Sequence, residues 1–91
     1  MTTSMLSKVY SKLKELFGDR LKSSNSEWPV ESDWYVGRYV IVPHFGRFGF
    51  EEFVVYDTAE YAWEGICDEP DDGSKVFFRC QTPEALFLAL T

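Results

Sequence analysis

The sequence predicts one small α+β domain: an N-terminal amphipathic helix, a small antiparallel sheet of three to four strands and a short C-terminal helix. Three observations favour this class. Apolar residues recur at helical spacing near the N-terminus. Residues 34–80 contain segments rich in β-branched and aromatic residues, which are typical of strands. With 91 residues, the chain can build one hydrophobic core and not two, so residues 1–91 are expected to form a single domain.

The N-terminal helix is expected over residues 1–18. Its apolar side chains form one stripe, with lysines on the opposite face: Met5, Leu6, Val9, Tyr10, Leu13, Leu16 and Phe17. Thr3 or Ser4 could cap the start of this helix. Gly18 suits the left-handed residue that often follows a helix.

Residues 19–33 are predicted to be a polar linker, because its serines, asparagine and proline resist regular structure. Trp28 is the large apolar residue near the centre of this linker. Its side chain could pin the linker to the core.

The sheet region follows the linker. A first strand is expected from Trp34 to Val42 and is ended by Pro43. A turn at residues 44–47 and a second strand from about Phe48 to Tyr56 complete an antiparallel hairpin. Val76–Cys80 is predicted to be a further short strand.

Residues 58–67 fit two structures. One set of residues falls at helical spacing: Ala59, Ala62, Trp63 and Ile66. Equally, Tyr61, Trp63 and Cys67 could line one face of a strand. Acidic residues near the start of the segment favour the helix slightly, because carboxylates stabilise the N-terminal end of a helix.

The C-terminal helix is expected over residues 82–91. Thr82 is a suitable N-cap, and Pro83 occupies the first helical position, where its missing N–H has no cost. Glu84 lies near the positive end of the helix dipole. Leucines and alanines continue the helix toward the end of the sequence.

Composition excludes several classes of protein. The chain is 45% hydrophobic and 18% aromatic, which does not fit a disordered protein. No continuous apolar run near the N-terminus suggests a signal peptide or a membrane span. The two cysteines are too few for a secreted disulfide scaffold, so a cytoplasmic setting is expected.

Residues that could support catalysis or metal binding are few. His44, Cys67 and Cys80 together provide one ligand too few for a structural zinc site. The acidic segment that begins at Asp68 fails the EF-hand calcium pattern, which requires oxygen ligands where this chain has Pro70 and, nine residues later, an arginine. The sequence contains no glycine-rich phosphate loop. We therefore expect no enzyme activity, no metal and no cofactor.

Charge is unevenly distributed along the chain. Residues 1–22 carry five basic and two acidic side chains, a net charge of +3, whereas residues 23–91 carry four basic and thirteen acidic side chains, a net charge of −9. Between Arg47 and Lys75 there is no basic residue. This acidic run either serves solubility or recognises a basic protein surface, in the extreme case by imitating a nucleic-acid backbone.

The second interpretation gives a specific prediction. The protein would be a small acidic inhibitor or regulator that engages a basic protein, such as a nucleic-acid-binding enzyme, in the manner of phage-encoded or anti-defence antagonists.

Pairing of the basic helix of one copy with the acidic body of another would instead give a homodimer. No direct DNA binding is expected, because carboxylates repel phosphates. The predicted contact residues are Glu51, Glu52, Asp57, Glu60, Glu64, Asp68, Glu69, Asp71, Asp72, Tyr56, Tyr61 and Phe45.

An alternative comes from a local resemblance. Phe48-Gly49-Phe50, followed by Phe53, resembles the aromatic core of the RNP1 motif of RNA-recognition-motif domains, within a segment of residues 46–79. The resemblance implies a single-stranded RNA-binding module whose first two phenylalanines stack on bases while Arg47 contacts phosphate. The pattern departs from the family at Glu51, where the motif has an apolar residue.

Overall fold

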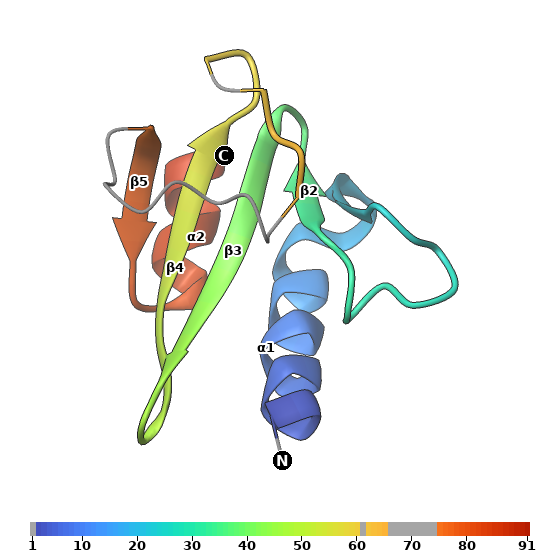
Figure 1. The fold of residues 1–91 in the computed structure, drawn as a ribbon, viewed down its shortest axis with the longest axis vertical. Helices are drawn as coiled ribbons and strands as arrows, with labels where there is room; N and C mark the ends of the chain where they lie inside the picture. The colour runs from blue at the N-terminus through green and yellow to red at the C-terminus, as the bar shows by residue number, and fades with distance from the viewer. Residues whose placement is uncertain (1, 61, 66–74) are drawn as a thin grey trace.

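The computed structural model describes residues 2–60, 62–65 and 75–91 of the chain. The predicted α+β class is confirmed, with a helix at each end and an antiparallel sheet between them (Figure 1). In chain order the elements are α1 (Thr2–Phe17), the 3-10 helix η1 (Gly18–Arg20), β1 (Leu21–Ser23), β2 (Trp34–Val36), β3 (Tyr39–Gly46), β4 (Gly49–Asp57), β5 (Val76–Cys80) and α2 (Pro83–Leu90). Neither α1 nor α2 has the length and apolar content needed to cross a membrane.

The five strands form one sheet in the order β1-β2-β3-β4-β5, and every neighbouring pair is antiparallel. The sheet is larger than expected for two reasons. Residues 21–23 of the predicted linker pair with β2. The predicted first strand is divided by a two-residue turn whose first residue, Gly37, has φ +61°. A glycine with positive φ at this position is typical of type II′ hairpin turns.

Pro43 does not end a strand, contrary to the prediction. It lies inside β3, where it pairs with Phe53 of β4, and the hairpin turn falls at residues 47–48 instead of residues 44–47. The other neighbour, β2, pairs with β3 only as far as Ile41. A proline is therefore tolerated here, since no further strand on that side needs its missing N–H.

The helix ends agree with the sequence only in part. Helix α1 begins at Thr2, so Thr3 and Ser4 lie inside it and not at its N-cap. Gly18 takes φ +59° where the helix ends, as expected. At α2 the predicted cap is confirmed: the Thr82 hydroxyl accepts a hydrogen bond from the Ala85 amide at 3.1 Å.

Both faces of the sheet carry buried apolar residues. On one face, which we call the helix face, α1 and α2 pack over the strands. Its buried residues are Leu13, Phe17, Leu21, Trp34, Val36, Ile41, Phe53, Val55, Leu86 and Leu90. On the opposite face, which we call the Trp63 face, the side chain of Trp63 packs beside Val40, Val42, Val54 and Tyr56. Residues 62–65, which follow β4, lie in front of this second face (Figure 1).

The preferred helix at residues 58–67 is not formed in the described part of that segment, and residues 61, 66 and 67 lie outside it. Residues 58–60 form a turn, in which the Asp57 carboxylate accepts a hydrogen bond from the Ala59 amide at 2.9 Å. Trp63 stacks on Tyr56 with ring centroids 5.2 Å apart. Packing against the sheet has therefore prevailed over a weak helical preference.

Substitutions of Leu86 and Leu88 test which side of α2 packs against the sheet. The two residues are close in one helix but differ in exposure, at 0% and 78%. Leu86→Ala should lower the free energy of unfolding by about 2–5 kcal/mol, since it removes buried methyl groups and leaves a cavity. Leu88→Ala should change it by less than about 0.5 kcal/mol. Urea denaturation followed by circular dichroism measures both values, and equal effects would contradict this packing.

Candidate binding surface

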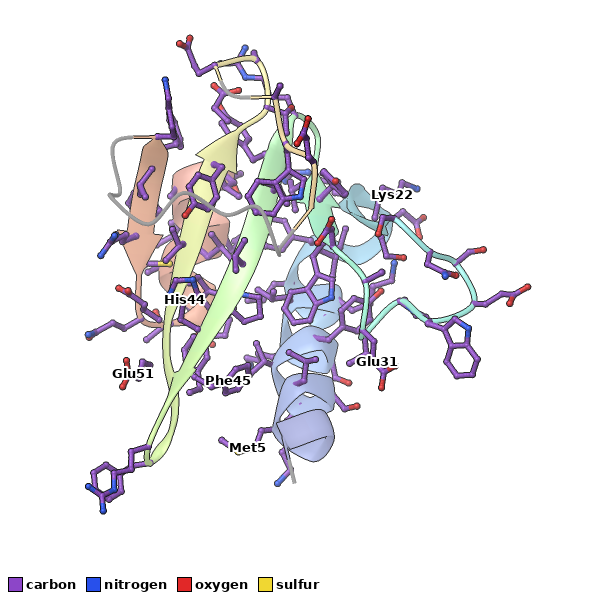
Figure 2. All side chains as sticks on the ribbon, viewed as in Figure 1. Met5, Lys22, Glu31, His44, Phe45 and Glu51 are labelled. Carbon is purple, nitrogen blue, oxygen red and sulfur yellow. The ribbon has the colours of Figure 1, made fainter. Side chains whose placement is uncertain are left out.

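The described residues of the acidic run do not gather on one surface. Glu51, Glu60 and Glu64 are exposed, but Glu51 is separated from Glu60 by most of the length of β4. Glu51 is the extra residue at the irregularity of the β3–β4 ladder, beside the hairpin (Figure 2). Glu60 follows the opposite end of β4, about 20 Å away at the rise per residue of a strand.

Two acids of the run are neutralised by arginines from other strands or turns. Glu52 pairs with Arg79 of β5 at 3.6 Å, and Asp57 pairs with Arg38 at 3.0 Å. The acidic run itself contains no basic residue. The fold nevertheless brings two arginines from other parts of the chain next to it. The surface around β4 is therefore less acidic than the sequence suggests.

Two predicted contact residues are buried, which corrects the prediction for them. Tyr56 is 1% exposed because its side chain lies on the Trp63 face, under the ring of Trp63. Asp57 is also buried, where it holds the following turn and Arg38. Phe45 is half-buried against Phe50, with ring centroids 5.8 Å apart. The remaining predicted residues, Tyr61, Asp68, Glu69, Asp71 and Asp72, lie outside the described residues.

The aromatic platform implied by the RNA-recognition resemblance is not formed. The sheet is a meander, and β3 and β4 are joined by a turn. Phe50 lies 4.6 Å from the ring of the fully buried Phe53 and packs against the core of the helix face. Phe48 lies in the hairpin turn. The two rings that would stack on bases therefore do not share an open surface.

The side chains that could take part in catalysis or metal binding are dispersed over the described part of the chain. Within those residues, no three His, Cys, Asp or Glu side chains are close enough to hold a metal ion. His44 lies directly opposite Glu52 in the β3–β4 ladder. Cys80 is half-buried in β5, and burial raises the pKa of its thiol. A raised pKa reduces the thiolate fraction, which is the nucleophilic form.

The feature that the sequence did not reveal is the loop at residues 24–33, which we call the Trp28 loop. Its two ends are joined, because the Ser24 amide donates to the Asp33 carbonyl at 2.9 Å and the Asp33 amide donates to the Ser24 hydroxyl at 3.1 Å. Inside it, the Asn25 side-chain oxygen accepts hydrogen bonds from the amides of Glu27 and Trp28 at 2.9 and 3.3 Å. Compact loops of this kind, with their ends close together, are frequently functional.

Two tryptophans of the body hold the second half of the Trp28 loop. The Trp34 indole N–H lies 3.0 Å from the Pro29 carbonyl and 3.3 Å from the Val30 carbonyl. The Trp63 indole donates to the Asp33 carboxylate at 3.0 Å. Burial raises the pKa of the neighbouring Tyr35, and the charge of Asp33 raises it further. The loop is therefore fixed to both the sheet and the segment that follows β4.

Trp28 itself does not pin the loop, contrary to the prediction. Its side chain is 63% exposed, whereas Trp34 is buried and makes the anchoring contacts. Glu27 and Glu31 are also exposed, and the Glu31 amide donates to the Trp28 carbonyl at 3.2 Å. Figure 1 shows the loop projecting from the body beside α1, and Figure 2 places Glu31 on this side of the molecule. The loop thus presents an indole ring and two carboxylates from a fixed backbone.

A scan against protein-family models, a search of the curated proteins and a search of the solved structures each give no match to this chain.

Asn25→Ala tests whether the Trp28 loop is fixed from within. The change removes the acceptor of two amides, so the exchange of the Glu27 and Trp28 amide protons with water should rise by about threefold to tenfold, as expected for hydrogen bonds that contribute about 0.5–1.5 kcal/mol. Exchange measured by NMR on the folded protein reports this. Ser26→Ala, at an exposed neighbouring position, is the control. Unchanged exchange in Asn25→Ala would show that the side chain does not order the loop.

The reactivity of Cys80 tests its environment. Its pKa is raised by burial, and the nearby charge of Glu52 also raises it, so less thiolate is present at a given pH. In a Cys67→Ser variant, alkylation by iodoacetamide at pH 8 should be slower in the folded protein than in urea. The alkylation rate of the folded protein should continue to rise with pH at values where the rate for the unfolded chain no longer changes. A folded-state profile that levels off at lower pH than the unfolded one would contradict this assignment.

Proposed function

We propose that the protein is a small, acidic, non-enzymatic binding protein that engages a basic protein surface and regulates or inhibits it. The observation that supports this function best is Trp28, which is 63% exposed on a loop whose backbone donates to the Asn25 side-chain oxygen and accepts from the Trp34 indole N–H. We therefore propose the Trp28 loop, and not the acidic run of β4, as the main contact.

An exposed tryptophan is well suited to this role. Trp side chains bury a large area when a partner covers them, and they are enriched among the residues that contribute most to binding. Part of the cost of binding comes from ordering side chains and loops at the interface. The Trp28 loop is already ordered by its hydrogen bonds, so a partner would meet a surface that needs little rearrangement.

Charge supports a basic partner. The chain has a net charge of −6, and Glu27 and Glu31 flank Trp28 on the loop. Glu51, Glu60 and Glu64 are exposed outside the loop segment and would increase the rate at which a basic protein approaches, through long-range attraction. Such long-range attraction is screened by salt over about 10 Å at 0.1 M ionic strength.

Capture of a partner from a lysate of the source cells tests this function. The tagged wild-type protein should retain a basic protein that is released by high salt. Trp28→Ala should weaken this retention at least about tenfold, which corresponds to about 1.4 kcal/mol, because an anchor residue is lost. Phe48→Ala is the matched control, since it removes another exposed ring from the hairpin turn.

Three results would contradict the proposed function. In the first, Trp28→Ala retains the same proteins as the wild type. In the second, only nucleic acid is retained. In the third, only a second copy of the chain is retained. Circular dichroism of each variant shows that its fold is intact.

A further inference from the structure

Arginine side chains in this protein lie over aromatic rings. The guanidinium of Arg20 is 5.6 Å from the centre of the Phe17 ring, that of Arg38 is 5.4 Å from the Tyr39 ring, and that of Arg47 is 6.0 Å from the Phe48 ring. Contacts at these distances are favourable because a cation is attracted to the face of an aromatic ring. Among aromatic side chains, tryptophan attracts cations most strongly.

Trp28 is the exception among the exposed rings. Within the described residues, three rings are more than half exposed: Trp28, Phe48 and Phe77. The guanidinium of Arg47 lies over the Phe48 ring, and Phe77 lies against Tyr39 with ring centroids 4.8 Å apart. Trp28 has neither an aromatic nor a cationic neighbour in the described part of the chain. The best ring for holding a cation is therefore the one left without a partner.

We propose that the Trp28 loop recognises an arginine-bearing segment of a basic protein. The guanidinium plane of the arginine stacks on the indole of Trp28, and its N–H groups donate to the carboxylates of Glu27 or Glu31. This inference rests on the proposed function and names the chemistry of its partner. Arginine fits better than lysine, because guanidinium is planar, is weakly hydrated, stacks on rings and binds carboxylates with two parallel hydrogen bonds.

The arginines of a second copy are poor candidates for this position. Arg20 donates to the Leu90 carbonyl at 2.8 Å in addition to covering Phe17. Arg38 and Arg79 are ion-paired with carboxylates, and Arg47 lies over Phe48. Each arginine of the chain thus already has an intramolecular partner, which favours a different protein over self-association.

Two synthetic peptides of equal length and charge, hexa-arginine and hexa-lysine, test the inference. Each is titrated into the 91-residue protein at about 0.1 M salt, where long-range attraction is reduced. Binding is followed by calorimetry and by tryptophan fluorescence. The wild type should bind hexa-arginine at least about threefold more tightly than hexa-lysine, as a stacked guanidinium predicts. Trp28→Ala should lose this preference, and Phe48→Ala should keep it.

A double variant, Glu27→Gln with Glu31→Gln, separates the carboxylates from the ring. It should weaken the binding of hexa-arginine while leaving a fluorescence change, because Trp28 remains. Equal binding of both peptides, weakened equally by Trp28→Ala, would overturn arginine recognition and leave the proposed function in place. Binding of hexa-arginine that Trp28→Ala does not change would also overturn it, and the lysate capture would then decide the proposed function separately.

Discussion

The indole ring of Trp34 joins the parts of the molecule on which the proposed binding surface depends. Trp34 is buried in β2, where it pairs with β1 on one side and with β3 on the other. Its ring packs against Tyr10 of α1, with centroids 5.3 Å apart, and its N–H reaches the Pro29 and Val30 carbonyls of the Trp28 loop. A buried indole N–H without an acceptor would be costly, so the loop satisfies a requirement of the core while the core fixes the loop. The exposed Trp28 is thus held by a buried tryptophan six residues later in the sequence.

Folding also changes the charge pattern of the chain. The acidic run has no base in the sequence, but β3 and β4 lie between elements that supply Arg38 and Arg79. Helix α1 likewise loses part of its basic character, since Lys12 pairs with Glu84 of α2 at 3.5 Å and Lys14 donates to the Leu21 carbonyl at 3.2 Å. The charges that remain unpaired include those beside Trp28, where no base of the described residues forms an ion pair with Glu27 or Glu31. Local sequence charge is therefore a poor guide to surface charge in a domain this small.

The helices, the hairpin and the last strand could be predicted because their signals are local. The periodicity of α1 and the cap formed by Thr82 need only neighbouring residues. The Trp28 loop could not be predicted in the same way. Trp28 and Trp34 are chemically identical, and which of them is buried depends on strand pairings that join distant residues. The serines, Asn25 and Pro29 did indicate an irregular segment, but its order comes from hydrogen bonds between its ends and from the indoles of Trp34 and Trp63. The burial of Tyr56 likewise follows from Trp63 packing on the opposite face of the sheet.

The sheet order has a consequence for how the chain acquires its structure. Each strand pairs with the one that precedes it, so every hairpin can form before the next residues are needed. Contacts between residues close in sequence form quickly, because little chain entropy is lost in making them. The docking of α2 on α1 is different: Arg20 donates to a carbonyl 70 residues away, and Phe87 packs edge-on against Phe17. This closure joins the beginning and the end of the chain, and it completes the helix face that the strands alone leave open to water.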